Sequence, residues 1–231
     1  MKKFCKRILN VCQKANPFFE VTVAIATIIS VILVGWTLKE MQIQRNNAYT
    51  SIIVVQPEEF KIDKDNPLMT QSLSDSNDPA IGVSLTAYNV GVGAAHSIQF
   101  TLDNDPIIDL LKHLKDSDPE TEYDWIEAQG SLTIKIGQTE GNINKHLGTS
   151  AQFLLPNAGN SMKTNFGPML SMIYSKAAEK DGILANIPSL HIKMEYCDVQ
   201  GQKQIGDIYL DVSVTGVLPD MYIISIQARE G

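Results

Sequence analysis

The chain has 231 residues, of which 44% are hydrophobic and 19% charged, so it is long enough for one domain and too apolar for a disordered polar tail. Its net charge of −7 is uneven: residues 1–38 hold five basic residues and one acidic residue, whereas residues 39–231 hold 14 basic and 25 acidic residues. The larger part is therefore a poor partner for phosphate backbones, and no nucleic-acid partner is expected.

Residues 1–16 form a basic leader. Between residues 4 and 12 the apolar side chains recur at helical spacing, which predicts a short helix lying on an anionic cytoplasmic membrane surface. Pro17 is expected to separate this helix from the next segment, because proline removes a helical hydrogen bond.

The 18 residues from Val21 to Leu38 contain no charge, and as a helix they span roughly 27 Å, close to the hydrocarbon thickness of a bilayer. We therefore predict a transmembrane helix over residues 17–38. The side chains expected to contact lipid are Phe18, Phe19, Val21, Ile25, Ile28, Ile32, Leu33, Trp36 and Leu38.

Two other interpretations fit this apolar run less well. A buried core helix is seldom uncharged over five turns. A cleaved signal peptide has an apolar part of about 7–15 residues and a small-residue cleavage site, and the run from Thr37 to Met41 offers no such site. A retained membrane anchor is the better interpretation.

The flanking charges predict the orientation. Five basic residues precede the apolar run, and only Lys39 and Arg45 follow it closely. By the positive-inside rule the amino terminus stays in the cytoplasm, and residues 39–231 lie in the periplasm or outside the cell, anchored in a bacterial inner membrane. A domain facing the cytoplasm is the alternative, and it would suit a component of a bacterial defence or stress system.

Residues 39–50 contain good helix formers and neither glycine nor proline, which predicts a helical stalk. After residue 50 the pattern changes to short apolar or alternating runs separated by Gly, Pro, Asn and Asp. The predicted strands are residues 52–55, 81–88, 97–102, 132–136, 151–155, 190–196, 205–214 and 222–228. The predicted helices are residues 107–114 and 168–180.

This series of elements predicts a mainly β fold for residues 51–231, namely a two-sheet sandwich with small helical insertions. A closed barrel is the alternative. Asn89, Gly91 and Gly93 follow an alternating strand and precede another, so they predict a bulged connection between strands. A dinucleotide-binding loop would need a third glycine and a following helix, which are absent. Asp198 and Gly201 lie between two long strands and predict a hairpin turn.

A basic amino end, one apolar helix, and the Asn-x-Gly-x-Gly-x-Ala and Tyr-x-Asp-x-x-Gly motifs together resemble a group of uncharacterised bacterial single-pass membrane proteins. Asn89, Gly91, Gly93 and Ala95 match the first motif, and Tyr196, Asp198 and Gly201 match the second. The chain departs from the group at Ser51 and Ala94, where the group commonly has proline. The resemblance implies an immunoglobulin-like sandwich on a membrane stalk, and it implies no activity.

No motif for catalysis or cofactor binding was found. The four histidines lack metal-ligand spacing, and the acidic run from Asp116 to Asp124 lacks the glycine and the glutamate of an EF-hand loop. Cys197 is the only cysteine beyond the apolar run, so it has no intramolecular disulfide partner in that part of the chain. We expect no catalytic residue, no metal and no cofactor.

The sequence therefore predicts a membrane-tethered, non-catalytic interaction module, with the lipid bilayer and either a protein partner or a second copy as its contacts. The alternative is a sensor of an envelope ligand or glycan. A hydrolase whose active site is built from residues distant in sequence is the least favoured hypothesis.

Overall fold

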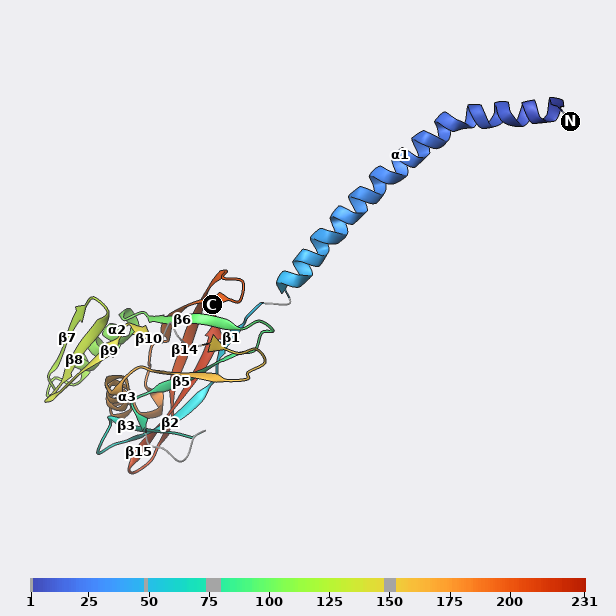
Figure 1. The fold of residues 1–231 in the computed structure, drawn as a ribbon. Helices are drawn as coiled ribbons and strands as arrows, with labels where there is room; N and C mark the ends of the chain where they lie inside the picture. Colours follow the sequence, from blue (N-terminus) through green and yellow to red (C-terminus); the bar gives the residue numbers. More distant parts are fainter. Residues whose placement is uncertain (1, 48–49, 74–79, 148–152) are drawn as a thin grey trace. The chain divides into compact units, whose positions relative to one another are not determined.

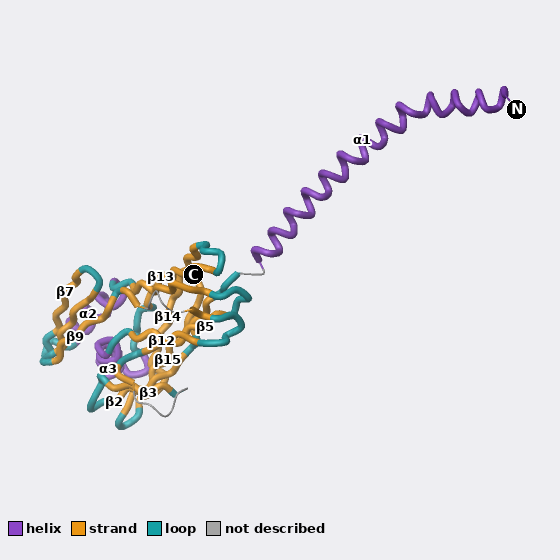
Figure 2. Tube along the Cα trace, viewed as in Figure 1, coloured by secondary structure: helices purple, strands orange, loops and turns teal. Residues whose placement is uncertain are grey.

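A computed structural model of the chain describes the backbone of residues 2–47, 50–73, 80–147 and 153–231. Side chains are described for residues 21–45, 50–73, 81–147 and 153–231. The chain divides into two units, Met1–Ala48 and Tyr49–Gly231 (Figure 1). The first is helical and the second consists mostly of strands (Figure 2). With 46% strand and 28% helix, the predicted mainly β class with an apolar helix at the amino end is confirmed.

The first unit is a single helix, α1 (Lys2–Asn47). One stretch of it, Val21–Arg45, is long and apolar enough to cross a membrane. The helix continues through Pro17, so the break predicted at that residue is not seen. Proline is tolerated in apolar helices, where neighbouring groups satisfy the carbonyl that it leaves without a partner. The carboxyl-terminal end of α1 includes most of the predicted stalk, of which residues 48 and 49 lie outside the described part.

The strands of the second unit form three antiparallel sheets in the part of the chain that the structure describes. The first sheet has the order β1-β5-β12: β1 (Ile53–Val55), β5 (Ser84–Asn89) and β12 (Ser161–Asn165). The third has the order β7-β8-β9: β7 (Tyr123–Ala128), β8 (Ser131–Ile136) and β9 (Thr139–Asn144).

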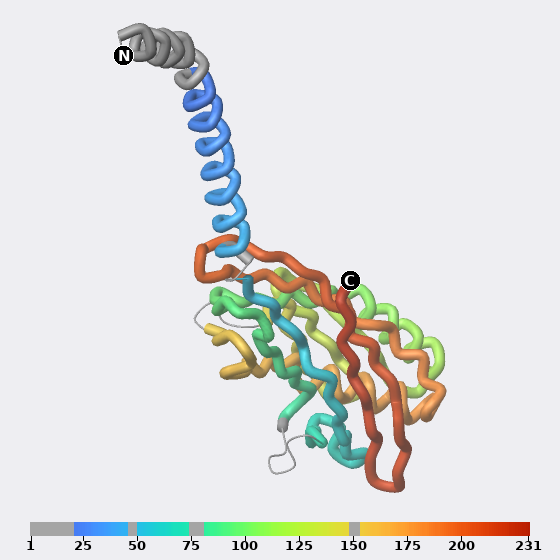
Figure 3. Tube along the Cα trace, turned by 90° about the vertical axis from the view of Figure 1, so that its right-hand side faces the viewer, coloured from blue at the N-terminus to red at the C-terminus, as the bar shows by residue number. Residues whose placement is uncertain are grey.

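The second and largest sheet has nine strands, eight of them in the order β10-β6-β13-β14-β15-β2-β3-β4. These are β10 (His146–Leu147), β6 (Ala95–Leu102), β13 (Leu190–Asp198), β14 (Lys203–Val217), β15 (Met221–Glu230), β2 (Glu58–Asp63), β3 (Met69–Ser72) and β4 (Ala80–Ile81). The ninth, β11 (Phe153–Leu154), pairs with β6. Figure 3 shows the long β14–β15 hairpin with β2 beside it.

The helices of this unit are α2 (Asp105–Ser117) and α3 (Pro168–Asp181), followed by the 3₁₀ turn Gly182–Leu184. α2 is amphipathic and buries Ile107, Leu110, Leu111 and Leu114. α3 contacts β9, where a Cβ at Gly141 would lie 2.6 Å from the Met169 Cγ. Glycine at this position therefore lets helix and strand approach closely.

Apolar side chains of the first and second sheets meet in one core. Leu85 and Phe166 on one side and Phe100 and Ile192 on the other line a small apolar cavity. Two sheets thus pack together, but the immunoglobulin-like sandwich is not confirmed: the sheets are curled, and a third sheet with two helices adjoins them.

Most predicted strands are found with shifted ends. Alternation over residues 190–196 matches β13, whose apolar side chains at every second position are buried. The predicted strand 81–88 is divided into β4 and β5, because Gly82 has a φ of 84° between them. Of the predicted strand 151–155, residues 151 and 152 lie outside the described residues. Six strands were not predicted: β2, β3, β7, β9, β10 and β12.

Candidate functional site: a clamp on the entry segment

Both motifs singled out in the sequence converge on residues 50–53, the start of the β domain, which we call the entry segment. The side chain of Asn89 is fully buried and makes four hydrogen bonds. Its Nδ2 donates to the carbonyls of Gly93 (2.6 Å) and Leu154 (3.0 Å). Its Oδ1 accepts from the amides of Ile52 (3.1 Å) and Gly91 (3.0 Å). One amide side chain thus links three segments that are distant in sequence.

Gly91 allows the loop after β5 to lie directly against the entry segment. A Cβ there would be 2.5 Å from the Ile52 nitrogen and from the Thr50 oxygen. Backbone hydrogen bonds close the contact: Val90 N donates to Ile52 O at 2.8 Å, and Gly93 N donates to Thr50 O at 3.2 Å. The glycine is required by close approach of two backbones and not by a positive φ.

The second motif holds the entry segment from the side of β13. The hydroxyl of Tyr196 donates to the Ser51 carbonyl at 2.8 Å in a buried position. A tyrosine hydroxyl is already protonated at neutral pH, and burial raises the pKa of this one further, so it is a donor there. Asp198 Oδ1 accepts from the amides of Gln200 and Gln202, and Gly201 has a φ of 76°, as the predicted hairpin turn requires.

We call Asn89, Gly91 and Tyr196, with the entry segment, the entry clamp. It brings together residues from both motifs, for which the sequence predicted roles in turns and strand connections. That residues 50–53 are their common partner was not predicted. The hydroxyls of the clamp belong to Thr50, Ser51 and Tyr196, and its described residues include no histidine, acid or lysine that could activate them. Its chemistry is that of positioning, because it fixes the segment that follows the apolar helix with buried hydrogen bonds.

The predicted lipid-facing residues lie on α1. The side chains of Val21, Ile25, Ile28, Ile32, Leu33, Trp36 and Leu38 are all exposed. Those of Phe18 and Phe19 lie outside the described side chains. The hydroxyls of Thr27, Ser30 and Thr37 donate to carbonyls four residues earlier at 2.8–2.9 Å, so these three polar groups of the apolar run are satisfied within the helix.

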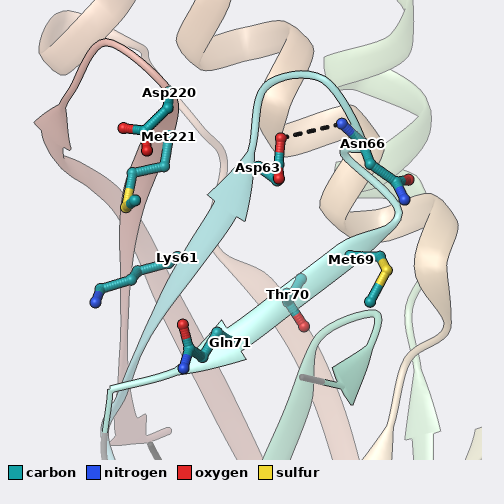
Figure 4. A pocket seen from close by; sticks show the side chains of 8 residues that line it. All are labelled: Lys61, Asp63, Asn66, Met69, Thr70, Gln71, Asp220 and Met221. Atoms are coloured by element: carbon teal, nitrogen blue, oxygen red, sulfur yellow. Dashed lines mark hydrogen bonds between the residues drawn. The ribbon is translucent and has the colours of Figure 1, made fainter. Parts of the chain in front are cut away.

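A pocket of about 220 Å³ lies where the β2–β3 hairpin meets the turn between β14 and β15 (Figure 4). Its charged lining residues are Lys61, Asp63 and Asp220. Asp63 Oδ1 accepts from the Asn66 amide at 3.2 Å, which shapes the hairpin, and Lys64 N donates to the Asp220 carbonyl at 3.0 Å, which joins the two turns. The lining thus carries one ammonium and two carboxylates, of which Asp63 is already bonded to the backbone amides of Asp65 and Asn66.

The outer face of the large sheet carries a cross-strand row of His191, Tyr209 and Arg229. The His191 and Tyr209 rings stack with centroids 4.9 Å apart, and Arg229 lies 4.9 Å from the Tyr209 centroid. His191 Nε2 is 2.9 Å from Asp207 Oδ1. Such cross-strand pairs contribute about 0.2–1 kcal/mol each, so the row is explained as sheet stabilisation.

Asp211 extends this row and gives a pH-dependent prediction. The Ser189 hydroxyl, at 2.5 Å, and then the Arg229 guanidinium hold the pKa of Asp211 below its usual value. Because the pKa of this carboxyl is lower in the folded chain than in the unfolded chain, the ionised carboxylate stabilises the fold fully above the unfolded pKa of about 3.9. This stabilisation is lost as the pH falls through the pKa of the folded state. Because the carboxylate is half exposed, Asp211→Asn should cost only about 0.5–1 kcal/mol at pH 7.

Thermal unfolding at pH 7 and pH 3 checks this prediction, since the difference between parent and Asp211→Asn should shrink at the lower pH. Asp116→Asn, at an exposed position on α2, is the control and should stay within about 0.5 kcal/mol of the parent. An equal loss for Asp211→Asn at both pH values would contradict the role given to the ionised carboxylate.

The remaining candidates for chemistry are dispersed. His96 lies against the Phe153 ring, His113 is 3.6 Å from Asp181, and His146 contacts Gln99. Among the described residues no three His, Cys, Asp or Glu side chains are grouped to hold a metal ion. Cys197 is a free cysteine of intermediate exposure.

Comparisons with known proteins give no relative: no family model matches the chain, no curated protein is similar to it, and no solved structure matches its fold. The group resemblance drawn from the two motifs therefore stays an expectation, and function has to be argued from the chain's own residues.

Proposed function

We propose that the protein is a membrane-anchored, non-catalytic interaction module, in which α1 spans a bilayer and the β domain binds a partner in a membrane complex. The observation that carries the proposal is the apolar run of α1, where every described side chain from Val21 to Arg45 is exposed. Exposure of apolar surface to water costs about 25 cal/mol of free energy per Å². Insertion of the helix into lipid is therefore favourable, because it removes this surface from water.

The entry clamp supports a role in positioning. The β domain begins with a segment that is held by buried hydrogen bonds from Asn89 and Tyr196. The clamp fixes where the β domain joins the chain that leads to α1, and this attachment raises the effective concentration of the domain near a partner in the same membrane. The flanking charges favour a cytoplasmic amino terminus and a β domain on the opposite side of a bacterial inner membrane.

The anchor is tested by alkaline carbonate extraction of cell membranes. The parent is expected to remain in the pellet. Placing Arg at both Ile28 and Ile32 should release the protein, because each arginine at the centre of a spanning helix costs about 2.5–3.5 kcal/mol. Ile28→Leu with Ile32→Leu is the matched control and should stay in the pellet. Release of the parent would refute the anchor.

Partner binding is tested separately by crosslinking in cells and by purification of the full chain in detergent. The proposal predicts that a second protein or a second copy elutes with it. A strictly monomeric particle with no crosslinked species would contradict the interaction role and leave the result on the anchor unchanged. Protease treatment of spheroplasts reports the side of the β domain.

The pocket in Figure 4 favours one second candidate, a sensor of a small ligand. A ligand that binds only the folded protein raises its apparent stability, so a thermal-shift screen of small zwitterions with the full chain is the test. A shift that Lys61→Met abolishes would support the sensor role. The absence of any shift across the screen would remove its support.

A further inference from the structure

Five large apolar side chains are exposed on three segments that meet at Asn89, and we call them the apolar rim. Each is between 47% and 59% exposed, and they are Ile52, Val90, Val92, Phe153 and Leu155. They belong to the entry segment, to the loop between β5 and β6, and to β11 with the residue that follows it. Apolar side chains scattered singly are ordinary on a protein surface, whereas these five lie on segments that hydrogen bonds join, which favours a contact role for them.

The backbone beneath the rim is fixed by hydrogen bonds. Asn89 joins the first two segments to the third through the Leu154 carbonyl. Asn160 accepts from Leu155 N at 2.6 Å and donates to Phe153 O at 2.7 Å, and Asn157 N donates to Gly91 O at 3.1 Å. The polar backbone is thus satisfied inside, while the apolar side chains are presented outward.

The segments that carry the rim contain no acidic residue, and Asp198, which lies opposite Ala95 on β13, is buried. Residues 50–56, 89–97 and 153–163 contain no Asp or Glu, and their one charged residue is Lys163, although residues 39–231 hold 25 acids. Other exposed apolar side chains have acids close by in sequence: Ile126 precedes Glu127, and Ile183 follows Asp181 by two positions. Anionic headgroups repel carboxylates, so a lipid surface fits these segments better than it fits the acidic remainder of the domain.

The rim also lies next to the apolar helix along the chain. Only residues 48 and 49 separate the end of α1 from Thr50, and the amides of Val92 and Gly93 both donate to the Thr50 carbonyl. The loop that carries Val90 and Val92 is therefore bonded to the first described residue after the helix. The connection from the end of the apolar run to Thr50 is residues 39–49, of which residues 39–47 are helical, and it keeps the rim within reach of the membrane surface in which the helix is anchored.

We propose that the apolar rim contacts the headgroup region of the bilayer that holds α1, with Val90, Val92 and Phe153 as its main lipid contacts. This inference rests on the anchor in the proposed function. Branched and aromatic side chains at the boundary between headgroups and acyl chains are stabilised by removal of apolar area from water. Contact at the rim would fix the tilt of the β domain on the membrane surface.

The test uses the full chain in nanodiscs that hold one copy each, with the native cysteines at positions 5, 12 and 197 replaced by alanine. A polarity-sensitive dye is attached through Val92→Cys, through Phe153→Cys and, as the matched control, through Ile126→Cys. Ile126 is also an exposed apolar residue, at 65%, but it lies on β7 beside an acid. Spin-labelled headgroups in the disc quench any dye that touches the bilayer surface.

The dyes at residues 92 and 153 should be at least about twofold brighter than the dye at residue 126, since they enter a less polar layer, and the spin labels should quench them alone. Equal emission and equal quenching at all three sites would overturn the proposal. Shielding of residue 92 only in vesicles that hold many copies would also overturn it, because a second copy would then be the contact. Recovery of the chain in nanodiscs tests the anchor separately.

Discussion

Asn89→Ala is expected to lower the free energy of unfolding of the β domain by about 3–4 kcal/mol. The side chain is fully buried, and its removal leaves two amides and two carbonyls without their partner. Each unsatisfied buried group costs about 1–3 kcal/mol, and relaxation and water entry keep the total below the sum.

Chemical denaturation of the full chain in nanodiscs, followed by Trp125 fluorescence with Trp36 replaced by Phe, measures this loss. Asn160→Ala is the matched control, because Asn160 also bonds two backbone groups of a neighbouring loop but is exposed. Water can replace its bonds, so a cost of about 1 kcal/mol or less is expected. Equal effects for the two variants would show that the buried hydrogen bonds of Asn89 contribute no more to stability than the exposed ones of Asn160.

The apolar helix could be predicted from the sequence because its signal is purely compositional. Eighteen uncharged residues specify a membrane-length helix whatever the rest of the chain does. The break expected at Pro17 was wrong, because a local propensity of one residue does not decide the path of a long apolar helix. Alternating strands such as β13 were also predictable, since each buries every second side chain.

Strands with polar inward positions could not be predicted. In β2 the inward-facing Glu58 is buried and accepts a hydrogen bond from the Thr86 hydroxyl at 2.6 Å, so the expected alternation of apolar residues is broken. In β12 the inward positions are Met162 and Thr164, which again hide the pattern. These strands depend on contacts with distant segments, and local periodicity carries no information about such contacts.

The same limit applies to the entry clamp. The glycine spacing after Asn89 and the turn after Tyr196 could be recognised locally as features of chain reversal. Their shared function as partners of residues 50–53 depends on contacts across 37 and 145 residues of sequence. A single sequence therefore shows that these residues have special backbone roles but does not show which segment they hold.

Gly91→Ala should release the entry segment from the β domain and lower the free energy of unfolding by about 3 kcal/mol. The added Cβ would lie 2.5 Å from the Ile52 nitrogen and the Thr50 oxygen, which are backbone atoms that no side-chain rotation can move. Relief requires the segment to shift, and this breaks the bond from Val90 N to Ile52 O and the bond from Tyr196 to Ser51 O.

Hydrogen exchange of the full chain in nanodiscs separates this local release from general unfolding. The amides of residues 52–55 should lose protection by more than about tenfold, because a local opening free energy lower by about 1.4 kcal/mol already raises exchange by that factor. The amides of β13 and β14 should change far less.

Gly206→Ala is the control for the effect of adding a methyl group to a glycine in a strand of the same domain. A Cβ there would meet only the flexible end of Met194, at 3.5 Å, which is an ordinary contact. Its exchange pattern is expected to match the parent. Retained protection of residues 52–55 in Gly91→Ala would mean that the loop can move away from the entry segment without cost, and the clamp would then have no role in holding that segment to the β domain.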